Sequence, residues 1–243
     1  MHLGLLLTSS YEYPGRYARW TVGFLSPPIQ IEGKGLDFTI SALNSRGKVI
    51  LKIIEDHLLS YDKLFKLQLV DDSTLSGKVI PSSRYFNEEE RSQQPSLFSL
   101  VRSIRELFSS EQLGQLGLYG AFGYDLAFQF EPIKLFKPRM DDQRDLLLYL
   151  PDEIIVVDKY RSDSWKVQFD FSKNGLSTRG LARSPCLSKF VPATASDEFE
   201  SRDTPQSQYA KNVVAAKEQF RLGNLFEVVL RLVNTYYYMY VNE

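Results

Sequence analysis

Three short strands in succession constrain the fold of this 243-residue chain more than any other feature. Two apolar runs, Leu146–Leu150 and Ile154–Val157, are separated only by Pro151-Asp-Glu153. After a turn at Tyr160–Asp163, every second residue is apolar, at Trp165, Val167, Phe169 and Phe171, and the residues between them are polar. Strict alternation indicates a strand with one buried face. Because a turn as short as Tyr160–Asp163 joins antiparallel neighbours, the strands on either side of it are predicted to pair antiparallel.

Two segments have the spacing of amphipathic helices. In the first, apolar residues recur at steps of three and four: Leu97, Leu100, Val101, Ile104, Leu107 and Phe108. Pro95-Ser96 opens this helix. The second helix begins at Thr204-Pro205 and ends at Gly223, and it places Tyr209, Val213, Ala216 and Phe220 on one face.

The N-terminal half also predicts strands. Leu3–Leu7 is expected to be a short buried strand, and Asp37–Leu43 a second one. Asn44–Gly47 has the composition of a hairpin turn, so Lys48–Leu51 is expected to be the returning strand. Helical spacing then starts at Ile53.

The remaining segments are expected to be irregular, with one exception. Residues 71–96 are polar, and the acidic run Glu88–Glu90 within them is predicted to be an exposed loop rather than a metal site. Residues 172–203 are rich in Ser, Pro and Thr and are predicted to be a linker or surface crossing. Leu225–Val229 is apolar and is predicted to be the next strand.

Composition excludes some function classes. The formal net charge of -1 gives no field that would attract nucleic acid or an anionic membrane. Cys186 is the single cysteine, so no intrachain disulfide can form, and a reducing compartment is expected. The apolar start at Met1–Leu7 is too short for a membrane span. We therefore expect a soluble, cytoplasmic protein.

Glycine recurs every third residue at Gly117, Gly120 and Gly123. This spacing differs from that of a dinucleotide-binding loop, and a structural role is favoured, in which another backbone approaches closely. Asp125 is then expected to be a helix cap or a paired carboxylate.

Several segments, in order along the chain, resemble component I of anthranilate synthase. Tyr119–Leu126 is similar to the Gly-rich strand-to-helix segment of that family, Pro151–Asp158 to the following strand, and Tyr209–Val229 to the helix and first strand of the chorismate-binding domain. The closest likeness is to bacterial enzymes that fuse component I to a glutamine amidotransferase. It rests on three further stretches: Ser10–Tyr17, Ala42–Gly47 and Phe128–Pro132.

The resemblance implies an α+β fold in which antiparallel sheets pack as a sandwich with flanking helices. It also implies two parts: a regulatory domain over residues 1–200, and the incomplete start of the chorismate-binding domain over residues 201–243. Family-like sequence stops at Val229, and the tail that follows diverges. We therefore expect an N-terminal fragment, either from a prematurely ended reading frame or as an authentic short variant.

Enzymes of this family convert chorismate, with ammonia or glutamine, to anthranilate and pyruvate and use Mg²⁺. The resemblance implies that the glutamates that bind the metal lie beyond the end of this chain. We therefore expect no catalytic residue, no bound Mg²⁺ and no lyase activity in this chain alone. A glutamine amidotransferase domain or subunit is the partner implied for the full-length enzyme.

The family binds tryptophan as a feedback inhibitor near a Leu-Leu-Glu-Ser motif. The matching residues here are Leu6-Leu7-Thr8-Ser9, followed by Ser10, so Thr8, Ser9 and Ser10 are the predicted tryptophan-binding residues. Thr8 replaces the acid that would meet the ligand's ammonium group, and Glu12 is a candidate substitute. Alternatively, the two serines only satisfy backbone groups of a turn.

Two other functions remain open from the sequence: a non-catalytic tryptophan-binding or interaction module, and a fragment of an aminodeoxychorismate-type or isochorismate-type enzyme. Individual side chains outside the motifs give weaker indications of function. His57 is expected to be a surface or half-buried residue. Arg16, Arg19 and Arg46 are candidates to hold a carboxylate, and four residues form a solvated face or ion-pair cluster: Arg139, Asp141, Asp142 and Arg144.

Overall fold

A computed structural model describes residues 3–8, 18–109, 114–131, 134, 139, 143–187 and 206–230. The chain divides into two compact units, residues 2–187 and residues 188–243 together with residue 1.

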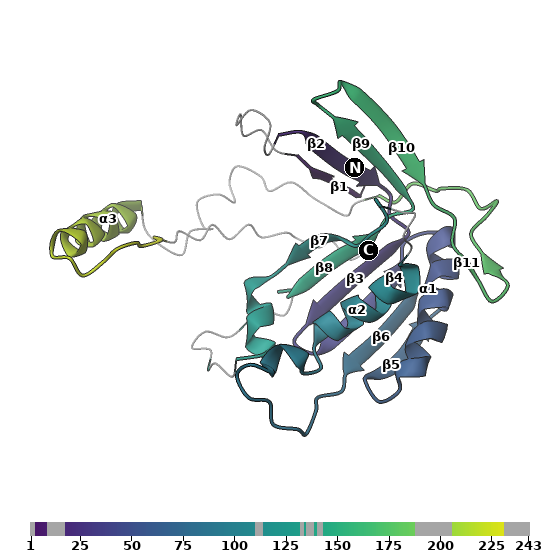
Figure 1. The fold of residues 1–243 in the computed structure, drawn as a ribbon, viewed down its shortest axis with the longest axis horizontal. Helices are drawn as coiled ribbons and strands as arrows, with labels where there is room; N and C mark the ends of the chain where they lie inside the picture. Colours follow the sequence, from purple (N-terminus) through teal and green to yellow (C-terminus); the bar gives the residue numbers. More distant parts are fainter. Residues whose placement is uncertain are drawn as a thin grey trace. The chain divides into compact units, whose positions relative to one another are not determined.

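The larger unit is built on a six-stranded antiparallel sheet (Figure 1). Its strands, in spatial order, are β5 (Phe65–Asp71), β6 (Thr74–Val79), β4 (Asp37–Ala42), β3 (Ile29–Lys34), β8 (Leu146–Leu150) and β7 (Tyr119–Phe122). The predicted strand over Asp37–Leu43 is confirmed as β4, and that over Leu146–Leu150 as β8.

A second antiparallel sheet has four strands, in the order β1 (Gly4–Leu7), β2 (Trp20–Leu25), β9 (Glu153–Asp158) and β10 (Asp163–Gln168). Only Pro151 and Asp152 separate β8 from β9, so the chain passes from the large sheet to the small one at this point. The predicted antiparallel pairing is confirmed, with Val156 opposite Trp165. A two-stranded hairpin follows, β11 (Ser172–Lys173) with β12 (Leu176–Ser177).

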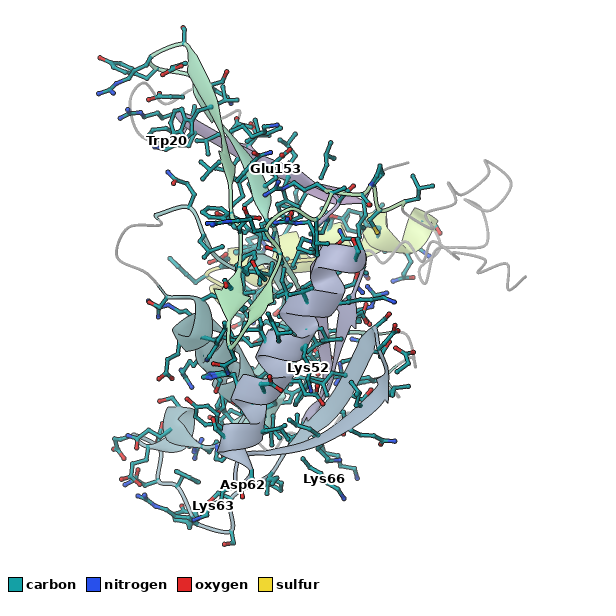
Figure 2. The ribbon with its side chains drawn as sticks, turned by 90° about the vertical axis from the view of Figure 1, so that its right-hand side faces the viewer. Trp20, Lys52, Asp62, Lys63, Lys66 and Glu153 are labelled. Atoms are coloured by element: carbon teal, nitrogen blue, oxygen red, sulfur yellow. The ribbon has the colours of Figure 1, made fainter. Side chains whose placement is uncertain are left out.

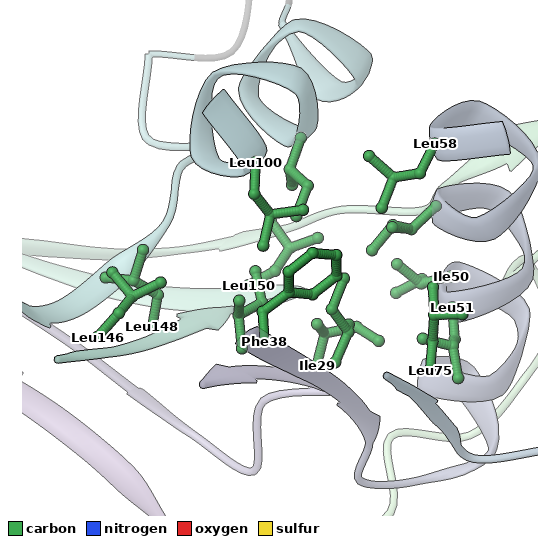
Figure 3. Packing of buried hydrophobic residues seen from close by; sticks show 14 of the residues in the cluster. Ile29, Phe38, Ile50, Leu51, Leu58, Leu75, Leu100, Leu146, Leu148 and Leu150 are labelled. Atoms are coloured by element: carbon green, nitrogen blue, oxygen red, sulfur yellow. The ribbon is translucent and has the colours of Figure 1, made fainter. Parts of the chain in front are cut away.

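Two helices, α1 (Ser45–Leu58) and α2 (Leu97–Phe108), pack on one face of the large sheet (Figure 3). Alternate strand residues point into the space between them and are buried: Ile29, Ile31, Ile40, Leu75, Leu146, Leu148 and Leu150. Leu100 and Ile104 of α2 meet this surface, as their spacing in the sequence predicts. Three short 3-10 helices also occur among the described residues of this unit: η1 (Leu59–Tyr61), η2 (Arg91–Gln93) and η3 (Tyr124–Gln129).

The small sheet contacts the large one on its opposite face, near strands β7 and β8. Phe24 of β2 packs against Tyr119 and Tyr149, with ring centroids 5.9 and 6.0 Å away. The described residues therefore form an α+β structure of antiparallel sheets with few helices, which confirms the predicted fold class.

The predicted turn at Asn44–Gly47 and the returning strand at Lys48–Leu51 are wrong. These residues form the first turns of α1. Asn44 is its N-cap, and its side-chain oxygen accepts a hydrogen bond from the Gly47 N–H at 2.9 Å. The helix is more stable here than a hairpin because it buries one row of apolar side chains on the sheet: Ile50, Leu51, Ile53, Ile54 and Leu58.

Two further features of the N-terminal half differ from the predictions. The polar stretch 71–96 contains a strand that the sequence pattern does not predict, β6 (Thr74–Val79), which pairs with both β5 and β4, whereas Glu88–Glu90 lie in an irregular segment as predicted. The strand predicted over Leu3–Leu7 exists as β1, but it is not buried: Leu6 is 68% exposed. An apolar strand is expected to be buried from its composition, yet β1 is the edge strand of the small sheet.

In the smaller unit, α3 (Gln206–Arg221) is confirmed, and Gly223 follows it with a φ of 76°, as expected for a C-terminal cap. The predicted start at Thr204-Pro205 lies outside the described residues. The strand predicted over Leu225–Val229 is wrong, because residues 224–230 form no strand. An apolar run becomes a strand only when a neighbouring strand accepts its hydrogen bonds, and no such neighbour exists among the described residues of this unit.

Candidate functional site

Of the predicted tryptophan-binding residues, the structure describes Thr8, which lies at one end of the small sheet. Thr8 directly follows β1, and continuing the register of Leu7 with Val22 places it opposite Thr21. The two hydroxyl groups are 2.9 Å apart. The ammonium group of Lys159, just beyond β9, donates to the Thr8 hydroxyl at 3.1 Å. Ser9, Ser10 and Glu12 lie outside the described residues.

An arginine–carboxylate pair holds the same end of the sheet together. Arg19 precedes β2 and donates to both carboxylate oxygens of Asp158, the last residue of β9, with a closest distance of 2.7 Å. Asp158 also accepts a hydrogen bond from the backbone N–H of Tyr160 at 3.0 Å. The Arg19 side chain is the main reason that the pKa of Asp158 lies below its ordinary value. Arg19 thus holds a carboxylate, as one of three arginines proposed for that role.

Aromatic side chains surround this ion pair. The Arg19 guanidinium lies over the Trp20 ring, 4.4 Å from its centroid, and 5.7 Å from that of Tyr160. Trp20 and Trp165 meet edge to face at 6.0 Å. In Figure 2, Trp20 lies toward one end of the small sheet, away from Glu153 at the start of β9. Because Trp20 is 46% exposed, the end of the sheet presents aromatic surface to solvent beside the charged groups.

The carboxylate of Asp158 is not available to meet the ammonium group of a ligand. Asp158 is buried, and Arg19 and two backbone N–H groups already occupy it. At Thr8 the nearby charge is the cationic Lys159. Sequence reasoning named Thr8 and Arg19 but missed Thr21 and Lys159, since only the pairing of β2 with β1 and β9 brings them together.

Arg46 also holds carboxylates, but inside the protein. It lies in the first turn of α1, is 1% exposed, and pairs with Asp152 and Asp170. Its guanidinium also donates to the backbone carbonyls of Thr178 and Phe169, at 2.7 and 2.9 Å. With every partner supplied by this chain, the cluster ties α1 to the segment around β11 and β12. Arg16, the third candidate, lies outside the described residues.

The glycine run is structural at two of its three positions. A Cβ atom on Gly120 would overlap the carbonyl oxygen of Leu147, and one on Gly123 would lie 3.2 Å from the Asp145 oxygen. Gly117 has no such neighbour, since only a Tyr119 ring carbon, 3.8 Å away, would be near its Cβ. The close approach therefore occurs where β7 and the residue after it lie beside β8 and the residue before it.

Asp125 is a paired carboxylate, one of the two roles predicted for it. It lies 3.2 Å from Arg139, which also pairs with the buried Asp145. Arg144 pairs with Glu32 at 3.3 Å. These contacts agree with an ion-pair cluster around Arg139, whereas Asp141 and Asp142 lie outside the described residues.

His57 and Cys186 show no sign of a catalytic role. His57 is half-buried, as predicted, with Nε2 3.1 Å from the Ser103 carbonyl oxygen. Burial raises the pKa of the Cys186 thiol, which disfavours the thiolate. Within the described ranges, no three His, Cys, Asp or Glu side chains gather as metal ligands would. Nor does any helix there have the length and apolar character needed to cross a membrane.

Comparisons with known proteins give the family. Residues 67–232 match the family described as chorismate binding enzyme. The chain is 40% identical over 227 residues to the anthranilate synthase of Azospirillum brasilense, which covers 93% of this chain and 30% of that protein. It is 24% identical to anthranilate synthase component 1 of Haemophilus influenzae, over 92% of this chain and 44% of that protein.

A third relative is the pyocyanine-specific anthranilate synthase component 1 of Pseudomonas aeruginosa, 21% identical over 92% of this chain and 43% of that protein. The chain thus spans less than half the length of these relatives. The chain belongs to the family of chorismate-binding enzymes, and its relatives place it with component I of anthranilate synthase.

Proposed function

We propose that this chain acts as the regulatory part of an anthranilate synthase, in the conversion of chorismate and ammonia or glutamine to anthranilate and pyruvate. The observation that carries the proposal is the 40% identity to an anthranilate synthase over 93% of this chain. The chain corresponds to only 30% of that relative. The chemistry, its Mg²⁺ ion and the contact with a glutamine amidotransferase then belong to the remainder of such an enzyme.

The direct test is an assay of the purified 243-residue chain with chorismate, Mg²⁺ and ammonia, in which anthranilate fluorescence is followed. We expect no anthranilate above the level without protein. A complete homologous enzyme, assayed in parallel, shows that the reagents are competent. Measurable turnover by this chain would contradict the proposal that the catalytic chemistry belongs to the remainder of such an enzyme.

We further propose that Thr8, Ser9 and Ser10 bind tryptophan at the end of the small sheet. Thr8 has a cation beside it, because Lys159 donates to its hydroxyl at 3.1 Å. An ammonium group there suits the carboxylate of an amino acid. Trp20 and Trp165 do not contribute to this site, because the strand register places them on the opposite face of the small sheet from Thr8 and Thr21.

Calorimetry tests this site. We expect L-tryptophan to bind with micromolar affinity, and Ser9→Ala to weaken that binding strongly. Ser82→Ala changes an exposed serine elsewhere in the larger unit and serves as the matched control. If tryptophan binds neither the unaltered chain nor the control, the regulatory site is absent, although the family assignment stands.

A further inference from the structure

An apolar trough lies between α2 and the edge strand β7, on the helical face of the large sheet. Its volume is about 400 Å³. Part of its lining comes from Leu148 and Leu150 of β8 and from Ile104 and Phe108 of α2. Leu118, just before β7, and Phe122, its last residue, also line it. A volume of this size lies within the range of small-molecule pockets. The trough is separate from the end of the small sheet where Thr8 lies.

Aromatic side chains shape two sides of the trough. Phe122 is 53% exposed and stacks on Phe98, with ring centroids 5.6 Å apart. Phe108 is half-buried and meets Phe171 edge to face at 5.2 Å. Both rings are therefore held in place by neighbours while part of their surface remains available. A flat apolar or aromatic group suits this lining.

Among the described residues that line the trough, one is charged. Arg105 projects from α2 one turn before Ser109, and it is exposed. No carboxylate of the described residues lies within ion-pair distance of the Arg105 guanidinium. Glu106, the next residue, instead accepts a hydrogen bond from Tyr61 at 3.2 Å. A guanidinium beside apolar surface matches a ligand that carries a carboxylate at one end of a hydrophobic body.

We propose that this trough binds a small aromatic carboxylate, with the ring between α2 and β7 and the carboxylate on Arg105. The apolar lining supplies affinity through the burial of the ring. Arg105 supplies selectivity, because a charge-assisted hydrogen bond discriminates between a carboxylate and a neutral group of the same shape. The proposal does not depend on the proposed function, since no residue of the tryptophan site takes part.

The probe pair for the test is 3-phenylpropionate and its neutral amide, 3-phenylpropionamide. Ligand-observed NMR titration of the 243-residue chain should give a Kd of about 1 mM or below for the acid. The amide should bind at least about fivefold more weakly, since one partly exposed charged hydrogen bond is worth roughly that factor. Equal binding of acid and amide would overturn the proposal.

Three variants locate the site. Arg105→Gln should abolish the preference for the acid, whereas Arg102→Gln, on the same helix but outside the trough, should leave it unchanged. Gly117→Leu adds a side chain to the lining where a Cβ has room, and it should weaken both probes. Unfolding curves confirm that each variant is folded. An acid preference that persists in folded Arg105→Gln would refute the proposed role of Arg105.

Discussion

At the scale of single residues, Arg46 shows how a charged side chain can be buried in this fold. Arg46 is 1% exposed. Its guanidinium donates hydrogen bonds to the backbone carbonyls of Thr178 and Phe169 and to the carboxylate of Asp170. Asp152, its main partner, is also buried. Removing Arg46 would leave the buried Asp152 carboxylate, among the described residues, with only the partly exposed Arg183, 3.4 Å away, and the loss of the buried partner costs more than the pair itself contributes.

We predict that Arg46→Met lowers the free energy of unfolding by about 3 kcal/mol or more, because Asp152 loses its buried partner. Urea unfolding measures the change. Arg102→Met on the exposed surface of α2 is the control and should stay within about 0.5 kcal/mol of the unaltered chain. Adding Asp152→Asn to Arg46→Met should recover part of the loss. No recovery would show that the charge left on Asp152 is not the cause.

The glycine run offers a second comparison between matched residues. Gly120→Ala would force a methyl group onto the Leu147 carbonyl oxygen, where β7 pairs with β8. We expect a loss of about 2–3 kcal/mol in the free energy of unfolding, as for other overpacked positions. Gly117→Ala, with its nearest neighbour 3.8 Å from the new Cβ, should be close to neutral. Equal effects of the two substitutions in thermal unfolding would contradict this account.

At the scale of elements, α1 illustrates a competition between two local structures. Asn-Ser-Arg-Gly is a plausible hairpin turn, yet Asn44 caps a helix here. The residues that follow repeat with helical spacing and cover the large sheet. Burial of that stripe stabilises the helix beyond what the propensity of its first turn provides.

We predict that Asn44→Ala destabilises the chain by about 1 kcal/mol, because the Gly47 N–H at the start of α1 loses its acceptor. Asn44→Asp keeps a side-chain oxygen at the same place and should retain most of the stability. Hydrogen exchange at the first turn of α1 provides the readout. Unchanged protection in Asn44→Ala would mean that packing alone determines where the helix begins.

At the scale of the whole molecule, the smaller unit presents much apolar surface. In and after α3, large apolar side chains are exposed: Tyr209, Val214, Phe220, Leu222, Phe226, Val228 and Val229. Phe226 is 98% exposed. Contiguous exposed apolar surface promotes association between chains.

We predict that ending the chain near Ser201 increases the yield of soluble protein, because this apolar surface is removed. The midpoint of thermal unfolding of the larger unit should not change, since that unit is compact by itself. The double substitution Phe226→Ser and Val229→Ser in the uncut chain should improve solubility in the same direction. A soluble yield that falls on truncation would contradict the prediction.

Much of the fold could be predicted where the signal was local and periodic. The alternation around Trp165 and the stripe of α2 each indicate one secondary structure, and both are confirmed. At the candidate site, the sequence identified Thr8 and Arg19, but Lys159 is 151 residues from Thr8 along the chain. A contact between residues so distant depends on strand pairing, which no local pattern encodes.

The sequence by itself determined the antiparallel character of the sheets, the position of α2 and the family, because periodicity and ordered motifs lie within short stretches of chain. Only the tertiary structure decided that the helix predicted from Ile53 begins at Ser45, that Arg46 is buried, that β1 is an exposed edge strand, and that residues 225–229 form no strand. Each of these outcomes depends on whether a distant segment supplies a packing surface or a hydrogen-bonding partner.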